Sequence, residues 1–258
     1  MREITSIEEL HGIILDLAKE FHRICVKNHI PYYLAGGSML GAIRHKGFIP
    51  WDDDMDLYVP RRYFNRLKQV FEKELPNYYC LKTIDDIPVL WGELMKMEDK
   101  RVIIKETLGK NGCFEHGLFI DIFPLDYTDM SKRLLSRHQT VLNLLKFHSV
   151  SKRNNHSPKT LFAKAICLLL GRNCYIKLIK HLVRSKGNYL TNYSGAYGEE
   201  KEAIKVEVIG KPTSYAFCDT FFYGVEKPEE YLTHIYGDYM QLPPEDKRRV
   251  HILKAYYL

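Results

Sequence analysis

The first thirty residues carry hydrophobic side chains at the spacing of a helix. Hydrophobic residues recur every three or four positions, at Ile7, Leu10, Ile14, Leu17, Phe21 and Ile24. This spacing places them on one face of an α-helix. Ser6, with Glu9 three residues later, matches the capping box that begins many helices. Pro31 interrupts the pattern, so we expect a helix over residues 7–28.

Two short hydrophobic segments follow this helix. Tyr32–Ala35 is typical of a buried strand that stops at Gly36 and Gly37, and residues 38–44 are typical of a helical turn. From Asp54 to Pro60, hydrophobic residues alternate with polar ones. Such alternation predicts a half-buried strand, with one face in the core, that ends at Pro60. A helix is expected next, over residues 61–75.

The remaining pattern predicts more strands, then helices. Strands are expected at residues 78–84, 93–98, 101–105 and 118–123, a helical region at 131–186, and a short helix at 228–236. This order indicates an α+β fold with a mixed sheet and flanking helices. We divide the chain into a catalytic core (residues 1–130), a basic helical region (131–190) and a C-terminal segment that packs on the core (191–258).

Composition restricts the class of protein. The chain has 258 residues, 45% hydrophobic and 27% charged, which excludes a mainly disordered or fibrous protein. No stretch approaches the roughly 20 apolar residues that span a bilayer, and the first ten residues have no secretory pattern. The six cysteines form no CxxC pair of the kind that binds zinc. We therefore expect reduced thiols and a cytoplasmic protein.

Positive charge is concentrated in one region. Residues 131–190 contain 13 Lys and Arg and no Asp or Glu, within a chain of net charge +6. Basic and amphipathic segments favour anionic surfaces such as a membrane, which suggests a peripheral position on the inner membrane face. The alternative is a basic helical hairpin that only packs on the core.

Four carboxylates gather just before the alternating strand, at Asp52, Asp53, Asp54 and Asp56. Asp54 and Asp56 point to one face of a strand, and burying such like charges without a cation is costly. A divalent ion removes this cost, and oxygen ligands select Mg²⁺ or Mn²⁺. Asp121, surrounded by apolar residues, is our candidate for a third ligand, whereas Asp126 is interpreted as a turn residue. The alternative for the cluster is an exposed acidic turn.

A glycine turn and a basic triplet precede these carboxylates. Gly36, Gly37 and Ser38 end a strand and begin a helix, an arrangement in which backbone N–H groups can bind phosphate. Arg44, His45 and Lys46 can hold the charge of a phosphate leaving group. The alternatives are an ordinary tight turn and a solvated basic turn.

Three segments resemble the LicD family, which includes bacterial phosphocholine transferases and is related to the fukutin proteins. The segments are Gly37–Asp56, Phe119–Asp126 and Tyr231–Pro244. The resemblance implies a nucleotidyltransferase-type fold. It also implies that Asp54 and Asp56 are the metal-binding pair, that Asp121 is the third carboxylate, and that Gly37 and Ser38 form the phosphate-binding turn. Met39 replaces a usual Leu, which conserves volume.

The resemblance predicts an enzyme that transfers a phospho-substituted alcohol, most simply phosphocholine, from a CDP-linked donor to a sugar hydroxyl. The acceptor is a cell-surface glycan or its lipid-linked oligosaccharide precursor, and CMP is released. Phosphoethanolamine, phosphoglycerol and phosphoribitol remain open as the transferred group. The alternatives are a nucleotidyltransferase that releases pyrophosphate and a non-catalytic module that binds anionic surfaces. No nucleic-acid partner is expected, because the four carboxylates repel a polyanion.

Overall fold

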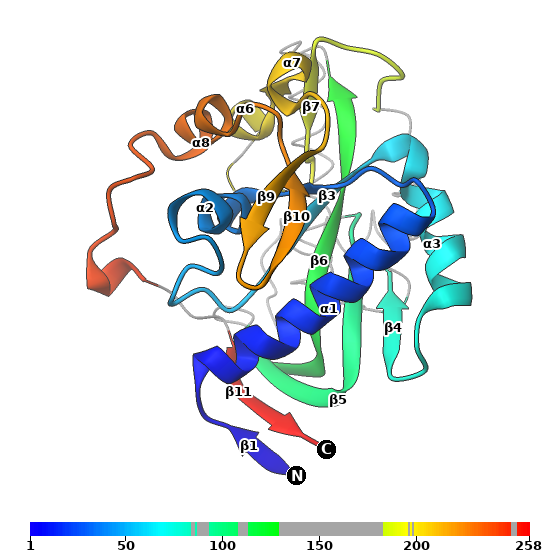
Figure 1. Cartoon of the computed structure of the whole chain (residues 1–258), viewed down its shortest axis with the longest axis vertical. Helices are drawn as coiled ribbons and strands as arrows, with labels where there is room; N and C mark the ends of the chain where they lie inside the picture. The colour runs from blue at the N-terminus through cyan, green and yellow to red at the C-terminus, as the bar shows by residue number, and fades with distance from the viewer. Residues whose placement is uncertain are drawn as a thin grey trace, which may run out of the picture.

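A computed structural model shows a mixed sheet with helices packed against it (Figure 1). The structure describes residues 1–83, 86, 93–107, 113–128, 183–195, 197, 199–248 and 252–258. The helical region predicted at 131–186 therefore lies almost entirely outside the described residues. Helices and strands are both abundant in the described part, so the α+β expectation is confirmed.

Among the described residues, nine strands form the main sheet, and two more form a separate hairpin. The strands are β1 (Arg2–Ile4), β2 (Tyr33–Leu34), β3 (Asp56–Pro60), β4 (Tyr79–Lys82), β5 (Met95–Thr107), β6 (Cys113–Thr128), β7 (Tyr189–Thr191), β8 (Ile204–Lys205), β9 (Thr213–Phe217), β10 (Thr220–Gly224) and β11 (Ile252–Tyr257). The main order is β1-β11-β5-β6-β3-β2, with β4 beside β5 and β7 beside β6. β3 and β6 pair in parallel, while β5 and β6 pair antiparallel.

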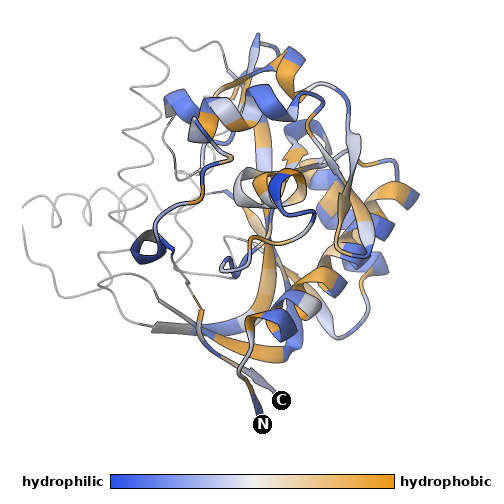
Figure 2. Ribbon diagram, turned by 60° about the vertical axis from the view of Figure 1, so that its left-hand side comes forward, coloured by the Kyte–Doolittle hydropathy of each residue, from blue (hydrophilic) through white to orange (hydrophobic). Residues whose placement is uncertain are grey.

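The helices cover the sheet with hydrophobic faces. They are α1 (Ile7–Lys27), α2 (Gly36–Arg44), α3 (Arg61–Glu74), α6 (Glu199–Glu202), α7 (Val206–Ile209) and α8 (Pro228–Tyr236), with a 3-10 turn η2 at Glu245–Lys247. α1 crosses the sheet and contacts β5, β6 and α3 (Figure 1). The central strands are mainly hydrophobic and the helices carry both kinds of residue (Figure 2). Burial of these apolar faces holds the layers together.

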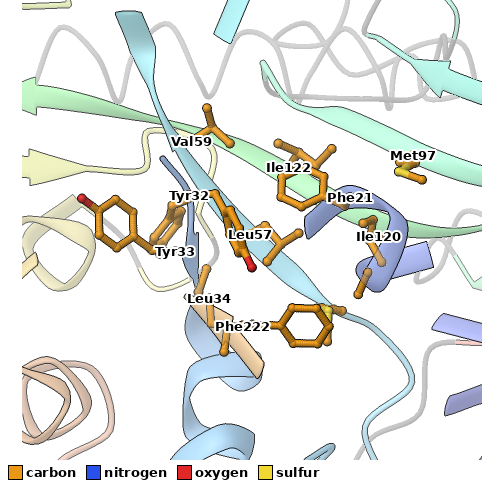
Figure 3. Close-up of a cluster of buried hydrophobic side chains, with 14 of the residues drawn as sticks. Phe21, Tyr32, Tyr33, Leu34, Leu57, Val59, Met97, Ile120, Ile122 and Phe222 are labelled. Atoms are coloured by element: carbon orange, nitrogen blue, oxygen red, sulfur yellow. The ribbon is translucent and has the colours of Figure 1, made fainter. Parts of the chain in front are cut away.

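The core lies where α1 meets the central strands. Phe21 of α1 lies among Leu57 of β3 and Ile120 and Ile122 of β6 (Figure 3). All four side chains are at most 1% exposed. Because β3 and β6 carry Asp56 and Asp121 and also form this core, these carboxylates are attached to close-packed strands.

The C-terminal segment is part of the same fold. β11 pairs antiparallel with both β1 and β5, which brings the two ends of the chain together (Figure 1). The β9–β10 hairpin contacts β2 and α2, and α8 contacts α2. These contacts place C-terminal residues next to the glycine turn at the start of α2.

The predicted local elements are largely confirmed. Ser6 accepts a hydrogen bond from the Glu9 N–H at 3.1 Å and begins α1, although the Glu9 carboxylate pairs with Arg2 instead of returning to Ser6. α3 and α8 occupy their expected residues. The two strands expected at 93–98 and 101–105 are one strand, β5, with an irregularity in its pairing between Asp99 and Ile103.

Three predictions are wrong. The strand expected from Asp54 begins at Asp56, so Asp54 lies in the segment before β3 and does not share a strand face with Asp56. The strand β3 is not half-buried, because Leu57, Tyr58 and Val59 are all buried. Its second face is covered by the C-terminal segment, which Tyr58 contacts. Asp126 is not a turn residue either. It lies within β6, fully buried, and its carboxylate accepts two hydrogen bonds from Arg61 at 2.6 and 2.7 Å.

The helices in the described part of the chain can be compared with those that span membranes. None of them combines the length and the apolar content that crossing a bilayer requires.

Candidate functional site

Asp56 and Asp121 lie side by side because β3 and β6 run parallel. The register pairs Asp56 with Asp121, and the Asp121 N–H donates to the Met55 carbonyl at 2.9 Å. Partners on adjacent strands project their side chains to the same face, with backbones about 4.8 Å apart. Two of the three predicted metal ligands, which are distant in the sequence, are therefore brought together by the sheet.

Asp54 adds a third carboxylate to this pair. Burial raises the pKa of Asp56 well above its usual range, and the charges of Asp54, Asp121 and Asp52 raise that pKa further. Asp54 is the largest of these three charge effects. The structure thus brings Asp54, Asp56 and Asp121 within electrostatic reach of one another.

The neighbouring acids, Asp52 and Asp53, also approach Asp54. One carboxylate oxygen from each of Asp52, Asp53 and Asp54 lies within 4.8 Å of the others. Asp53 is 1% exposed and accepts a hydrogen bond from the Ile252 N–H at 2.5 Å, which ties this turn to β11. Asp53 is therefore not solvated. One of its oxygens is occupied by the Ile252 N–H, a contact that stabilises the fold.

Lys96 completes a row of charges across three strands. β5 pairs Lys96 with Asp121, just as β3 pairs Asp56 with Asp121. The Lys96 ammonium lies 2.8 Å from Asp121 Oδ1 and 3.1 Å above the centre of the Phe119 ring. The lysine compensates part of the negative charge at Asp121, and it also lowers the pKa of Asp56 somewhat.

The glycine turn borders this row of charges. α2 begins at Gly36, and the Ser38 hydroxyl accepts a hydrogen bond from the Asp56 N–H at 2.8 Å. A Cβ added at Gly37 would stand 2.8 Å from Asp52 Oδ2, which is closer than side chains tolerate. At Gly36 an added Cβ would stand 3.8 Å from Asp56 Oδ2. Glycine therefore lets the start of α2 lie directly against the carboxylates.

The three predicted basic residues follow at the other end of α2. The Arg44 guanidinium donates to the Tyr239 carbonyl at 2.7 Å and to His45 Nε2 at 3.0 Å. Burial and the adjacent Arg44 lower the pKa of His45, which agrees with a neutral imidazole that accepts this bond. Lys46 has a left-handed backbone, with φ of 58°, and its carbonyl accepts the Cys218 N–H. Arg44 thus already holds the loop that follows α8.

Tyrosines from the C-terminal segment form a wall beside the same turn. The Tyr236 hydroxyl would stand 3.6 Å from a Cβ at Gly36, and it shares a hydrogen bond of 2.8 Å with the Tyr197 hydroxyl. The Tyr231 hydroxyl accepts the Gly36 N–H at 2.9 Å. Burial raises the pKa of Tyr197 to about 12, so its hydroxyl is neutral at physiological pH.

Sequence reasoning missed Lys96, the tyrosine wall and a buried acid, Glu202. A signal for Lys96 existed, because a lysine flanked by Met95 and Met97 in a strand needs a buried partner. Glu202 carried no such signal, since it lies in the charged run Glu199–Glu202. Burial raises the pKa of Glu202 to about 7. Only the tertiary structure shows that this side chain is buried.

The donor set of this site suits a divalent cation. It consists of carboxylate oxygens, which Mg²⁺ and Mn²⁺ prefer, and burial and mutual repulsion disfavour their ionised forms. A cation would reverse that penalty. Asp54, Asp56 and Asp121 have donor atoms of the predicted kind, whereas the oxygens that lie within 4.8 Å of one another are those of Asp52, Asp53 and Asp54. The predicted ligand set therefore stays a prediction.

Comparison with known proteins gives the family. Residues 29–148, which include the glycine turn and the aspartates at 52, 53, 54, 56 and 121, match the family described as LicD/FKTN/FKRP, nucleotidyltransferase domain. The chain is also 32% identical over its full length, and over the full length of the relative, to the lipopolysaccharide cholinephosphotransferase LicD of Haemophilus influenzae. The chain belongs to the LicD family. The resemblance seen in its motifs is thereby confirmed.

Two further relatives match shorter parts of this LicD-family chain. An uncharacterized protein of Rickettsia prowazekii is 29% identical over 41% of the chain and 44% of the relative. Another, from Rickettsia typhi, is 46% identical over 31% of the chain and 26% of the relative. These partial matches add no activity to the assignment.

Proposed function

We propose that this protein is a metal-dependent transferase that moves phosphocholine from a CDP-linked donor to a sugar hydroxyl and releases CMP. The acceptor is a cell-surface glycan, foremost lipopolysaccharide, or its lipid-linked precursor. Membership of the LicD family and full-length similarity to a lipopolysaccharide cholinephosphotransferase support the proposal. The structural observation that carries it is the pairing of Asp56 with Asp121 on parallel strands beside the Gly36–Ser38 turn.

Each part of the site has a role in this reaction. Asp54, Asp56 and Asp121 would hold Mg²⁺ or Mn²⁺, which when bound neutralises charge on a diphosphate. Backbone N–H groups at the start of α2 bind phosphate oxygens of the donor. We also propose a nucleotidyltransferase-type fold. The mixed sheet, the glycine turn and the carboxylates paired on adjacent strands support it.

Side chains of the protein supply the groups that the transfer requires. The sugar oxygen attacks the phosphorus that bears choline, and the new oxygen–phosphorus bond forms as the bond to CMP breaks. Asp121 orients the sugar hydroxyl and accepts its proton. The Lys96 ammonium, held 2.8 Å from Asp121, compensates part of that carboxylate's negative charge. His45 and Lys46 lie at the far end of α2 and stabilise the departing CMP, with Arg44 holding the adjoining loop.

A lipid-linked acceptor places the enzyme at a membrane. We propose a cytoplasmic protein that associates peripherally with the inner membrane face. The basic region 131–190 would make that contact, because its lysines and arginines favour anionic lipids. Binding to anionic vesicles that falls with salt, and no binding to neutral vesicles, is the expected result. Equal binding to both would overturn this part of the proposal.

A product assay tests the proposed reaction. The full chain is incubated with a sugar acceptor and with CDP-choline, CDP-ethanolamine, CDP-glycerol or CDP-ribitol, with Mg²⁺ or with EDTA. CMP release from CDP-choline, dependent on both acceptor and Mg²⁺, is the expected result. Preference for another CDP-linked donor would show that a different group is transferred by the same reaction. Pyrophosphate released from CTP, with no CMP from any donor, would instead identify a nucleotidyltransferase.

A further inference from the structure

A buried carboxylate, Glu202, lies at the end of a hydrogen-bond chain that starts at the glycine turn. Glu202 closes α6 and is 4% exposed. Its Oε2 accepts a hydrogen bond from the Tyr58 hydroxyl at 3.3 Å, and its Oε1 accepts the Tyr197 N–H at 3.2 Å. Both carboxylate oxygens are therefore used as acceptors.

Two tyrosines connect this carboxylate to Gly36. The Tyr58 hydroxyl accepts from the Tyr231 hydroxyl at 3.4 Å, and the Tyr231 hydroxyl accepts the Gly36 N–H at 2.9 Å. Tyr58 is 4% exposed and Tyr231 is fully buried, so bulk water does not compete for either hydroxyl. Each hydroxyl donates once and accepts once. Every hydrogen bond in this series is therefore donated in the same direction, from the Gly36 N–H toward Glu202.

The packing around Glu202 shows that its position is specific. A Cβ added at Gly195 would stand 2.0 Å from Glu202 Oε1, so the carboxylate lies directly against the backbone of that turn. Only glycine at 195 leaves room for it. The chain of hydrogen bonds joins α6, β3, α8 and α2, which are distant in sequence.

We propose that Glu202 is a positioning residue for the donor phosphates, acting through Tyr58 and Tyr231 on the Gly36 N–H. The inference rests on the proposed function, because it assumes that the start of α2 binds the donor. The first N–H groups of a helix point along its axis and have no partner within the helix. Fixing the Gly36 N–H therefore fixes the direction in which the next two N–H groups point.

The donor–acceptor order of these hydrogen bonds can be tested with a substitution that preserves the volume of the side chain. Glu202→Gln preserves volume but replaces one acceptor by a donor. If the new amide nitrogen faces Tyr58, the Tyr58 hydroxyl must turn toward Tyr231 and displace the Tyr231 proton. If it faces Tyr197, two donors oppose each other. In the first case the Tyr231 hydroxyl loses its acceptor and must reorient beside the Gly36 N–H, and in the second case the Tyr197 N–H loses its acceptor.

The experiment measures donor binding, kinetics and the Gly36 amide in the full-length protein at about pH 8, because burial raises the pKa of Glu202 to about 7 and both of its oxygens accept only above that value. Glu200→Gln, on the same helix with an exposed side chain, is the matched control. Ala35–Gly36 is the single Ala–Gly pair in the sequence, so carbonyl-¹³C alanine with ¹⁵N glycine gives one selected NMR signal. We expect Glu202→Gln to shift this signal and to raise the KM for CDP-choline about tenfold, with the KM for the acceptor unchanged. Glu200→Gln changes none of these.

Tyr231→Phe provides a second route if Glu202→Gln folds poorly, because it removes the hydroxyl that accepts the Gly36 N–H. It should shift the same signal and raise the same KM, and the Tyr58→Phe/Tyr231→Phe pair should lose little more than either single variant. An unshifted Gly36 signal together with an unchanged donor KM would overturn the inference.

Failure of the proposed function is a separate outcome. If the wild-type protein turns over no CDP-linked donor, that function fails. Calorimetric binding of CDP-choline and the Gly36 signal still report on the hydrogen-bond chain. Weaker binding by Glu202→Gln than by Glu200→Gln then supports the positioning role, and equal binding contradicts it.

Discussion

Lys96 and Asp121 form an ion pair on adjacent strands, at 2.8 Å between Nζ and Oδ1. On its other side, Asp121 lies opposite Asp56. One carboxylate therefore has a cation on one flank and a second carboxylate on the other. This relationship explains how three acids can share a small volume in the folded protein, and it leads to the first prediction.

Lys96→Met should destabilise the protein strongly. The lysine side chain is 9% exposed, and the substitution removes the ammonium that lies 2.8 Å from Asp121 Oδ1. Loss of one partner of a buried pair costs about 3–5 kcal/mol. Urea denaturation measures the change in the free energy of unfolding. Lys96→Met/Asp121→Asn should recover part of the loss, and a single variant as stable as wild type would contradict the ion-pair interpretation.

Asp56→Asn should change activity and stability in opposite directions. Turnover is expected to fall by about 100-fold or more, since a proposed metal ligand is lost. The free energy of unfolding measured in EDTA should rise, because the substitution removes a carboxyl whose pKa is raised by burial and by Asp54, Asp121 and Asp52. Asp16→Asn, exposed on α1, should change neither quantity. Near-normal turnover in Asp56→Asn would remove the carboxylate site from the mechanism.

Stabilisation by Mg²⁺ or Mn²⁺ should increase with pH. The raised pKa of Asp56 means that the native protein without a cation retains a proton there, which the cation must displace. Melting temperatures with and without Mg²⁺, measured at about pH 5 and about pH 8, should differ more at the higher pH. A cation effect that is equal at both pH values, or that persists in Asp56→Asn, would show that the ion binds elsewhere.

Glu202 should make stability fall as pH rises. Burial raises its pKa from 4.5 to about 7, so between these values the native state holds a proton that the unfolded state has lost. The stabilisation is complete below the unfolded pKa and is lost as pH rises through the folded pKa. It amounts to about 3 kcal/mol. Unfolding of wild type and Glu202→Gln across this range measures it, and parallel pH dependences would contradict it.

Arg61→Lys should also destabilise the protein, although both side chains are cationic. Arg61 donates two hydrogen bonds to the buried Asp126 carboxylate, and a further nitrogen lies 2.8 Å from Glu93. Lysine cannot reproduce this fork, so we expect a loss of about 1.5–3 kcal/mol in the free energy of unfolding. Arg62→Lys, at the exposed neighbouring position, is the control and should be neutral. Equal stabilities would contradict the role of the bidentate pair.

Local signals in the sequence predicted the local structure well. Helical spacing and a serine cap located α1, and Pro228 with the following hydrophobic residues located α8. Prediction was wrong where burial depends on distant segments. The polar face of β3 was expected to be exposed, yet Tyr58 is covered by residues of the C-terminal segment. Asp126 resembles a turn residue because it follows Pro124 by two residues, and the partner that buries it, Arg61, is remote in sequence.

The sequence by itself determined the family and the chemical character of the site. A cluster of acids beside a glycine turn is a local pattern, because repulsion between neighbouring charges and the freedom of glycine act over a few residues. Only the tertiary structure decided which acids meet. Parallel pairing of β3 and β6 places Asp121 next to Asp56, and β5 supplies Lys96. Glu202 reaches the glycine turn through two buried tyrosines, since hydrogen bonds join whatever the folded core brings within reach.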